Sequence, residues 1–375
     1  MTDVVVVGAG IVGAACAYYA ARAGLTVTVL DRGPIAGGTS GAGEGNLLVS
    51  DKAPGPELGL MLESLRLWRE LAGVVGPDAI ELEPKGGLVV AATAAGLDHA
   101  LQLADEQREG GVEAIEVPAH RLCAREPRLA EGLAGGIWYP QDLQVQPMLA
   151  TAYLLRASKA TVHCGVDVVS VDRGGVRTRD GRRFRADVIV NAAGVWAGDV
   201  AALAGTRLPV APRRGYVLVT EPLGNRRAPA PIRHKVYAAD YMSTVASDDA
   251  ALQVSAVVEG TRAGTVLIGA SRERVGFAAG FSVPALRRLA AEAIRLFPFL
   301  ADTAVIRAYR GFRPYTPDHL PAIGPDPTRP GLYHACGHEG AGVGLAPVTG
   351  AVIAAQILGT PPPVDPAPFA AGRFA

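Results

Sequence analysis

Hydrophobic residues open the chain in an unbroken run and then change their period. Residues 4–7 are four consecutive valines, which is typical of a strand buried on both faces of a sheet. Small and apolar residues over 11–24 predict a helix that ends at a glycine, and residues 26–30 predict a second buried strand. The opening of the chain therefore predicts one β-α-β unit of a parallel sheet.

Helix and strand patterns continue to alternate beyond this unit. Helices are predicted over 57–71, 96–110, 147–158 and 284–297, strands over 86–92, 135–140 and 304–312, several β-rich segments over 208–270, and a strand, glycine turn and helix over 331–358. The helix over 147–158 has proline in its first turn, where the missing N–H costs nothing.

The pattern changes at residue 161. Apolar and polar residues alternate around two turn signals, Gly174-Gly175 and Asp180-Gly181, and predict a small antiparallel meander. Residues 187–194 then read as a buried strand that runs into a glycine turn, so we expect the chain to return to its first sheet near residue 187. No low-complexity linker or repeat divides the sequence, and interleaved domains are therefore expected.

Composition and charge exclude several classes of protein. The formal net charge of the 375 residues is zero, which argues against nucleic-acid binding. The four cysteines show no metal-ligand spacing, so free thiols, no metal site and a cytoplasmic location are expected. Two uncharged stretches, 4–21 and 340–364, raise the alternative of membrane insertion. The first has no basic residue before it and the second is interrupted by glycines and prolines, so a soluble protein is expected.

Three glycines after the first strand have the spacing of a dinucleotide-binding turn. In G-x-G-x-x-G, Gly8 makes the tight turn, Gly10 lets the backbone approach a pyrophosphate, and Gly13 lets the helix pack on the sheet. The N-terminus of that helix adds its dipole and free N–H groups. Asp31, at the end of the second strand, can accept hydrogen bonds from both ribose hydroxyls and would repel the 2′-phosphate of NADP.

A second glycine-rich turn favours FAD over NAD as the dinucleotide. Residues 337–344 lie between a predicted strand and a predicted helix, whose N-terminus can face the electron-rich pyrimidine end of a reduced flavin. The chain also leaves its first sheet after two strands, whereas an NAD enzyme tends to complete the sheet first. An NAD-dependent dehydrogenase is the alternative.

These features resemble the D-amino-acid oxidase superfamily of FAD-dependent amine oxidoreductases, in the branch of glycine oxidase, sarcosine oxidase and the β-subunits of hydroxyproline, proline and opine dehydrogenases. The resemblance rests on the fingerprint with Asp31 and Arg32, and on residues 39–52, 187–197, 311–324 and 337–350. It implies an α/β fold in which a Rossmann-like FAD-binding domain is interleaved with a substrate domain built on a mostly antiparallel sheet. The implied boundaries are 1–80, 145–207 and 325–375 for the FAD-binding domain, and 81–144 and 208–324 for the substrate-binding domain.

The resemblance also implies which residues hold the cofactor. Residues 40–47 should wrap the pyrophosphate and the flavin edge, Val168 should meet the adenine, and 337–344 should line the flavin. The cofactor-binding set is Gly8, Gly10, Ile11, Val12, Gly13, Asp31, Arg32, Thr39, Ser40, Gly45, Asn46, Leu47, Val168, Ala193, Gly194, Trp196, Gly337, His338, Gly340, Ala341, Gly342, Val343 and Gly344. Monomeric sarcosine oxidases tether the flavin through a cysteine near the segment that here spans 313–324. This segment has none, so non-covalent FAD is expected.

Arg313 matches the arginine that clamps the substrate carboxylate in this family. A planar guanidinium forks onto a carboxylate with two hydrogen bonds and so fixes its orientation. Arg310, on the same predicted strand, is a rival for this role. His338, Tyr216 and Tyr241 are further candidates for contact with the substrate, and a structural role is the alternative for each.

The implied reaction is oxidation of the C–N bond of a small amino acid or N-substituted amino acid, of the glycine, sarcosine, D-amino-acid, hydroxyproline or opine type. Hydride passes to flavin N5, and the imine then gives a keto acid and an amine. Oxygen or another carrier reoxidises the flavin, and Lys52 and Lys235 are candidates for a lysine above the ring. Partner subunits or a homo-oligomer are compatible with the resemblance. The alternative is a non-catalytic flavin-binding or electron-transfer subunit of a multi-subunit dehydrogenase.

Overall fold

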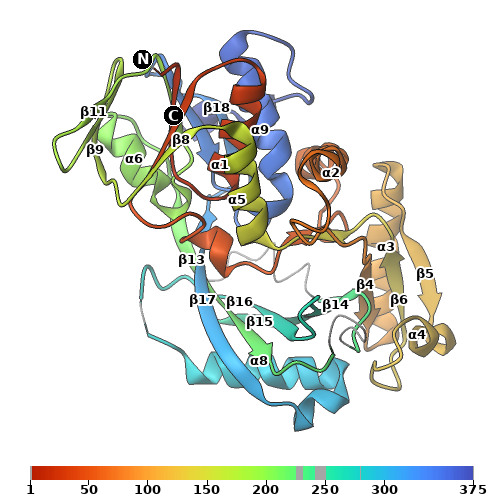
Figure 1. Ribbon diagram of the computed structural model, residues 1–375. Helices are drawn as coiled ribbons and strands as arrows, with labels where there is room; N and C mark the ends of the chain where they lie inside the picture. The colour runs from red at the N-terminus through yellow and green to blue at the C-terminus, as the bar shows by residue number, and fades with distance from the viewer. Residues whose placement is uncertain (1, 225–230, 241–250, 279, 375) are drawn as a thin grey trace.

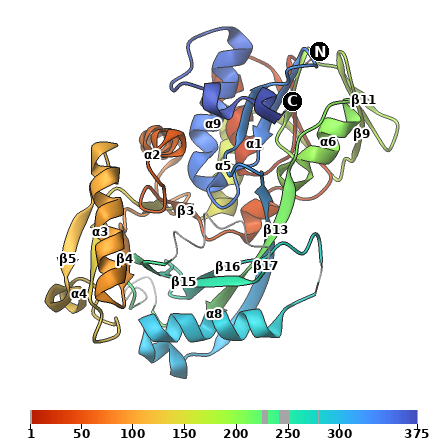
Figure 2. The ribbon, with the colours of Figure 1, turned by 180° about the vertical axis from the view of Figure 1, so that it is seen from behind.

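The chain folds into two parts, each built on its own β-sheet. The computed structural model describes residues 2–224, 231–240, 251–278 and 280–374. In Figures 1 and 2 the part drawn at the top contains both termini, and the part at the bottom contains mainly the green to cyan middle of the chain. The two parts share several chain crossings, as expected for interleaved sheets.

A sheet of mainly parallel strands forms the centre of the upper part. In spatial order its strands are β18 (Ala322–Pro325), β19 (Leu332–Cys336), β12 (Val188–Asn191), β1 (Val4–Val7), β2 (Val27–Asp31) and β8 (Thr161–Cys164). Only the edge pair β18–β19 is antiparallel. The four valines of β1 are buried because β1 is central and both faces of the sheet are covered.

The strand expected near residue 187 joins this sheet as β12, but it is not the point at which the chain first returns. β8 already pairs in parallel with β2, with Thr161 opposite Thr28, so the chain returns at residue 161. β8 is an edge strand whose side chains are only partly buried, and it therefore lacks the continuous apolar run of a central strand. The meander that follows is confirmed as a three-stranded antiparallel sheet of β9 (Val168–Asp172), β10 (Gly175–Thr178) and β11 (Arg183–Phe184).

Helices cover the parallel sheet on one face, and the meander covers the other. α1 (Ile11–Arg22) lies between α9 (Gly342–Leu358) and α5 (Pro147–Ser158) and contacts both. On the opposite face, the meander and α6 (Ala197–Leu203) pack on the other side of β1. Apolar residues of α1 and α9 are therefore buried on nearly all sides, which explains the long uncharged stretches in the sequence.

α2 (Pro56–Val75) compensates for a proline inside α9. Pro347 has no N–H to donate to the carbonyl oxygen of Val343, one turn earlier. The buried Trp68 indole on α2 donates to that oxygen instead, with Nε1 3.2 Å away. The Ser64 hydroxyl, also on α2, donates to the Gly344 carbonyl oxygen at 2.6 Å. Two side chains of α2 thus donate hydrogen bonds to carbonyl oxygens in the first turn of α9.

The lower part is an eight-stranded, mostly antiparallel sheet. In spatial order its strands are β17 (Val305–Tyr315), β13 (Ala211–Thr220), β16 (Val266–Arg272), β15 (Gln253–Gly260), β14 (Lys235–Ala238), β4 (Gly87–Ala91), β6 (Gly135–Tyr139) and β5 (Ile115–Pro118). β14 and β4 are its one parallel pair among the described strands. α8 (Val283–Leu296) covers the face that bears Tyr216, Leu218 and Ile268. The other face is directed toward the parallel sheet (Figure 2).

The remaining elements are short or peripheral. They are α3 (Ala94–Glu109), α4 (Ala119–Arg125), the strand pair β3 (Asn46–Leu47) and β7 (Leu143–Gln144), and the 3-10 helices η1 (Thr39–Ala42), η2 (Gly194–Trp196), η3 (Pro298–Asp302), η4 (Ala367–Phe369) and η5 (Ala371–Phe374). Within the described residues, no helix combines the length and the apolar character needed to span a membrane.

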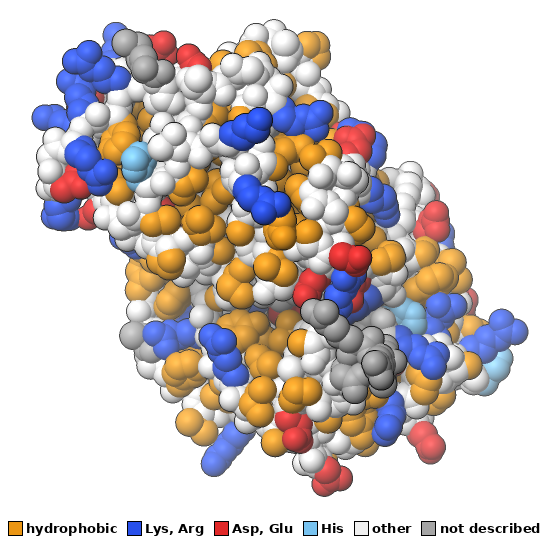
Figure 3. Space-filling view, viewed as in Figure 1, with side chains coloured by type: hydrophobic (Ala, Val, Ile, Leu, Met, Phe, Trp, Pro, Cys, Tyr) orange, Lys and Arg blue, Asp and Glu red, His pale blue; other side chains and the backbone are white. Residues whose placement is uncertain are grey.

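Charged side chains of both signs are interspersed on the face shown in Figure 3, with arginines gathered over the meander at the upper left. Three of these arginines form ion pairs within the meander region: Arg177 with Asp172, Arg179 with Asp167, and Arg182 with Asp180.

Candidate functional site

A large cavity lies where the two sheets face each other. It encloses about 1740 Å³ outside the protein atoms, counting its opening to solvent. Its wall combines the turn after β1, the loop 38–46, the turns after β12 and β19, and residues of β13 and β17. A ligand in this cavity would contact segments from both ends of the chain.

The turn after β1 leaves no room for side chains. Gly8 has φ +121°, and a Cβ there would lie 2.2 Å from the Ala192 carbonyl oxygen of the neighbouring strand turn. Gly13 faces away from the cavity, and a Cβ there would lie 1.9 Å from the Gly8 carbonyl oxygen, so it packs α1 on the sheet. Ile11 and Val12, at the start of α1, line the cavity. Gly8 and Gly13 thus meet the steric demands of the turn and of helix packing that the sequence suggested.

Asp31 is held at the cavity by two backbone donors. Ala9 N donates to its Oδ2 and Gly33 N to its Oδ1, both at 2.7 Å. Each oxygen keeps a further lone pair, so the carboxylate can still accept from a ribose. The adjacent Arg32 lies over the Trp196 ring, 4.1 Å from its centroid, and Trp196 stacks on Phe277. Arg32 and Trp196 form this end of the cavity wall.

The loop 38–46 joins the two sheets. The Ser40 Oγ accepts from the Ile11 N–H at the start of α1 at 2.9 Å, and the Thr39 hydroxyl donates to the Phe312 carbonyl oxygen at 2.7 Å. The loop lies flat on the lower sheet because Gly311 has no side chain: a Cβ there would lie 2.6 Å from that of Ala42. The loop thereby brings Gly45 and Asn46 to the cavity.

His338, in the turn after β19, is a neutral, buried wall residue. Its Nε2 lies 2.9 Å from the Thr349 Oγ1, which itself donates to the Leu345 carbonyl oxygen, so the imidazole carries its proton on Nε2. Burial lowers the pKa of His338 to about 3. The imidazole thus ties the turn to α9, whose first residues Gly342 and Val343 face the cavity.

Arg313 lies on the cavity face of the lower sheet. Its Nη1 donates to the Ser271 carbonyl oxygen at 2.8 Å. Gly215 makes the space for its guanidinium, since a Cβ there would lie 2.3 Å from Nη1. The rival Arg310 lies over the Phe281 ring and outside the described cavity wall. The structure therefore brings Arg313, and not Arg310, to the cavity.

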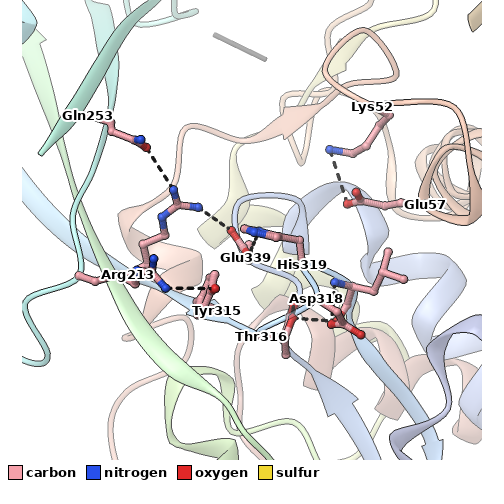
Figure 4. A network of polar contacts seen from close by, with 12 residues as sticks. Lys52, Glu57, Arg213, Gln253, Tyr315, Thr316, Asp318, His319 and Glu339 are labelled. Atoms are coloured by element: carbon pink, nitrogen blue, oxygen red, sulfur yellow. Dashed lines mark hydrogen bonds and ion pairs between the residues drawn. The ribbon is translucent and has the colours of Figure 1, made fainter. Parts of the chain in front are cut away.

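A polar network adjoins Arg313 and fixes the carboxylate of Glu339 (Figure 4). Arg213, opposite Arg313 in the β13–β17 ladder and almost fully buried, forms an ion pair with Glu339 at 3.2 Å. His319 Nδ1 lies 2.8 Å from the other Glu339 oxygen. Burial lowers the pKa of Arg213, and Glu339 acts against this shift. Glu339 lines the cavity with both carboxylate oxygens already engaged by these two partners.

The two candidate lysines are paired in the interior. Lys235 is buried and contacts the Glu259 carboxylate and the Asn46 amide oxygen. Lys52 forms ion pairs with Asp51 at 2.8 Å and with Glu57 at 3.7 Å. Neither lysine belongs to the described cavity wall, although Asn46 links Lys235 to it.

Most of the candidate residues from the sequence converge on this cavity. Those that line it are Gly8, Gly10, Ile11, Val12, Asp31, Arg32, Thr39, Ser40, Gly45, Asn46, Val168, Ala193, Gly194, Trp196, Arg313, His338, Gly340, Gly342 and Val343. Their contacts with a cofactor or substrate stay predictions.

Six candidates lie elsewhere, for different reasons. Those outside the described wall are Gly13, Leu47, Gly337, Ala341, Gly344 and Tyr216. Leu47 is part of the core, Gly337 packs on Thr316, and Gly344 packs on Met61. Tyr216 lies on the α8 side of the sheet and donates its hydroxyl to the Gly280 carbonyl oxygen at 3.1 Å. Tyr241 falls outside the described residues.

Some residues of the cavity wall were not named as individual candidates from the sequence. They include Glu44, Gly215 and Gly311. Gly215 and Gly311 are direct cross-strand partners, and each lies inside a strand. A glycine inside a strand signals close approach of another segment, which was the signal available in the sequence. Glu44 stands in the glycine-rich loop, but its direction could not be read from the sequence.

The cavity fits FAD on three observations. α1 and α9 both begin at the wall, and neither N-cap residue, Gly10 or Ala341, caps its helix with a side chain; of the first N–H groups of α1, that of Ile11 donates to Ser40. Gly10 lines the wall without a side chain, as the close approach of a pyrophosphate to the backbone requires. Burial raises the pKa of the wall residue Cys336 to about 12, which disfavours the thiolate needed for a covalent tether.

Comparison with known proteins agrees with this site. The family model described as FAD dependent oxidoreductase matches residues 3–356. Glycine oxidase of Geobacillus kaustophilus is 30% identical over 384 residues, covering 99% of this chain and 97% of that protein. Hydrogen cyanide synthase subunit HcnC of Pseudomonas aeruginosa is 29% identical over 424 residues, covering 99% and 96%.

A solved structure also superposes over nearly the whole chain. The crystal structure of glycine oxidase from Geobacillus kaustophilus matches with a TM-score of 0.86 at 27% identity, covering 98% of both chains. The expected combination of a Rossmann-like sheet with an antiparallel sheet is thereby confirmed. Family model, sequence and fold agree, and the chain belongs to the FAD-dependent oxidoreductase family.

Proposed function

We propose that this protein oxidises the C–N bond of a small amino acid or N-substituted amino acid, producing an imine that water converts into a keto acid and an amine. The observation that carries this proposal is the placement of Arg313 in the cavity where the dinucleotide-binding turn and the N-terminus of α9 also meet. Similarity to a glycine oxidase supports an amino-acid substrate. FAD, when bound, supplies the acceptor for the two electrons removed.

The chain's own residues position the substrate. Ser271 holds one nitrogen of the Arg313 guanidinium, which leaves the group oriented along the sheet. A carboxylate bound by this fork has a fixed direction, so its α-carbon is presented in one orientation only. Arg213 is neutralised by Glu339, so the two adjacent arginines do not have equivalent roles.

We further propose non-covalent FAD, a cytoplasmic location, and the division into FAD-binding and substrate-binding domains given by the sequence. The four cysteines are free thiols, which suits a reducing compartment. A relative whose name marks it as a subunit supports partner subunits, and oxygen or another carrier then takes the electrons. A flavin-binding subunit without its own turnover is the second candidate, on the same similarity.

Arg313→Ala tests the proposal, with Arg310→Ala as the matched control on the same strand. Losing a buried charge pair costs about 2–5 kcal/mol, so substrate binding should weaken by at least about thirtyfold. The assay is anaerobic bleaching of the flavin by glycine, sarcosine, D-amino acids, hydroxyproline, proline and opines.

We expect Arg313→Ala to keep its yellow colour but to bleach only at far higher concentrations, and Arg310→Ala to behave as the wild type. If no amino acid bleaches the flavin of the wild type, the proposed enzymatic activity is contradicted and the electron-transfer subunit is favoured.

A further inference from the structure

We propose that Glu44 receives the amino group of the substrate, opposite the carboxylate site at Arg313. This inference rests on the proposed oxidation of amino acids and names the second anchor of that site. Glu44 lies in the loop 38–46 and lines the cavity. It was not among the candidate residues from the sequence.

Glu44 is a buried carboxylate that needs a donor. The residue is 8% exposed, and its Oε1 is buried without a hydrogen-bond partner in the described structure. An unsatisfied buried acceptor destabilises the folded protein, and more so when it is charged. Such a group at a cavity wall is best explained by a donor that arrives with the ligand.

The lower sheet is shaped to hold this carboxylate. Glu44 rests on Gly269 of β16, where a Cβ would lie 2.1 Å from its Oε1 and 2.8 Å from its Oε2. Gly269 is two residues from Ser271, whose carbonyl oxygen holds the Arg313 guanidinium. Glu44 and Arg313 both line the cavity, each held where a glycine of the lower sheet leaves room for it, so a carboxylate and a guanidinium border the same ligand space.

Lys235 is already engaged by another carboxylate. Lys235 contacts Glu259 and Asn46, two residues after Glu44. Burial raises the pKa of Glu259, and the charge of Glu44 adds to this shift. Because Lys235 forms an ion pair with Glu259, the Glu44 carboxylate can pair with a cationic ligand.

This arrangement selects for an amine. A carboxylate can accept an N–H from an ammonium group or from a neutral amine, whereas the ether or hydroxyl of an otherwise similar acid offers one donor or none. A site built around a buried polar group rejects ligands that leave that group unpaired. Glu44 should therefore discriminate between an amino acid and the amine-free acid of the same skeleton.

Glu44→Gln tests the assignment, with Glu126→Gln as the control. Glu126 is also a buried glutamate with an unpartnered Oε1, but it lies outside the described cavity wall. The probes are matched pairs: glycine and glycolate, D-alanine and D-lactate, and proline and tetrahydro-2-furoate. Affinities are read anaerobically on the holoenzyme, from flavin bleaching for the amino acids and from shifts of the flavin spectrum for the acids. The FAD affinity of each variant is measured separately.

We expect Glu44→Gln to bind the amino acid at least tenfold more weakly and the matched acid at least as tightly as the wild type. Its FAD affinity should stay within threefold, and Glu126→Gln should change neither ligand. Equal weakening for both members of a pair, or loss of FAD affinity, would show that Glu44 shapes the cavity or holds the cofactor. A wild type that responds to no amino acid would instead refute the proposed function and this inference with it.

Discussion

Because His338 is buried and neutral in the folded protein, the free energy of unfolding depends on pH, and the sign of this dependence follows from the structure. Its pKa is lowered from 6.5 to about 3 by burial. Between these two values the unfolded chain binds a proton at this imidazole that the folded chain does not bind. The contribution of His338 to stability is therefore complete above pH 6.5 and is lost as the pH falls toward 3. The free energy of unfolding should fall by about 1.4 kcal/mol per pH unit, or about 2 kcal/mol between pH 6.5 and pH 5.

His338→Gln isolates this contribution, because glutamine is neutral and keeps an N–H donor for Thr349. Urea unfolding of wild type and variant at pH 7.5 and pH 5, with saturating FAD, gives two differences in free energy. The wild type should lose about 2 kcal/mol more than the variant on acidification. His99→Gln, at an exposed position, controls for the loss of a histidine as such. The same pH dependence in wild type and His338→Gln would refute the reasoning.

Two further predictions concern the elements that shape the cavity. Gly8→Ala should abolish FAD binding, because its methyl group would collide with the Ala192 carbonyl oxygen; the ratio of flavin to protein absorbance checks this. Gly24→Ala, also at a positive φ but with nothing within 4 Å, should keep the flavin and lose only about 1–2 kcal/mol. Trp68→Phe should lower the free energy of unfolding by about 1–3 kcal/mol, because the Val343 carbonyl oxygen loses its donor; urea unfolding measures it, and an unchanged midpoint would contradict that role.

Local sequence determined the nucleotide-binding unit because its signals are short in range. Four valines, a helix ending near a glycine and an acidic residue after the next strand specify β1, α1 and β2, and all three form as expected. α5 spans residues 147–158 as predicted, since proline at its start and loss of the apolar pattern at its end are both local. The steric needs of Gly8 and Gly13 also follow from the local turn.

The edge strand β8 and the direction of the Tyr216 side chain could not be predicted from the sequence, because both depend on contacts with residues far away in the chain. β8 has no continuous apolar run, and only its pairing with β2 assigns it to the parallel sheet. Tyr216 appeared to be a wall residue, but the register of β13 turns it toward α8, because neighbouring side chains on a strand point to opposite faces.

The sequence by itself determined the β-α-β unit and the glycine turns. Only the tertiary structure decided that Arg313, and not Arg310, reaches the cavity, and that Glu44 lies on the same sheet face. The physical reason is that turns and helix ends are specified by neighbouring residues. A binding site is specified by which strand faces meet, and that depends on pairings between residues far apart in the chain.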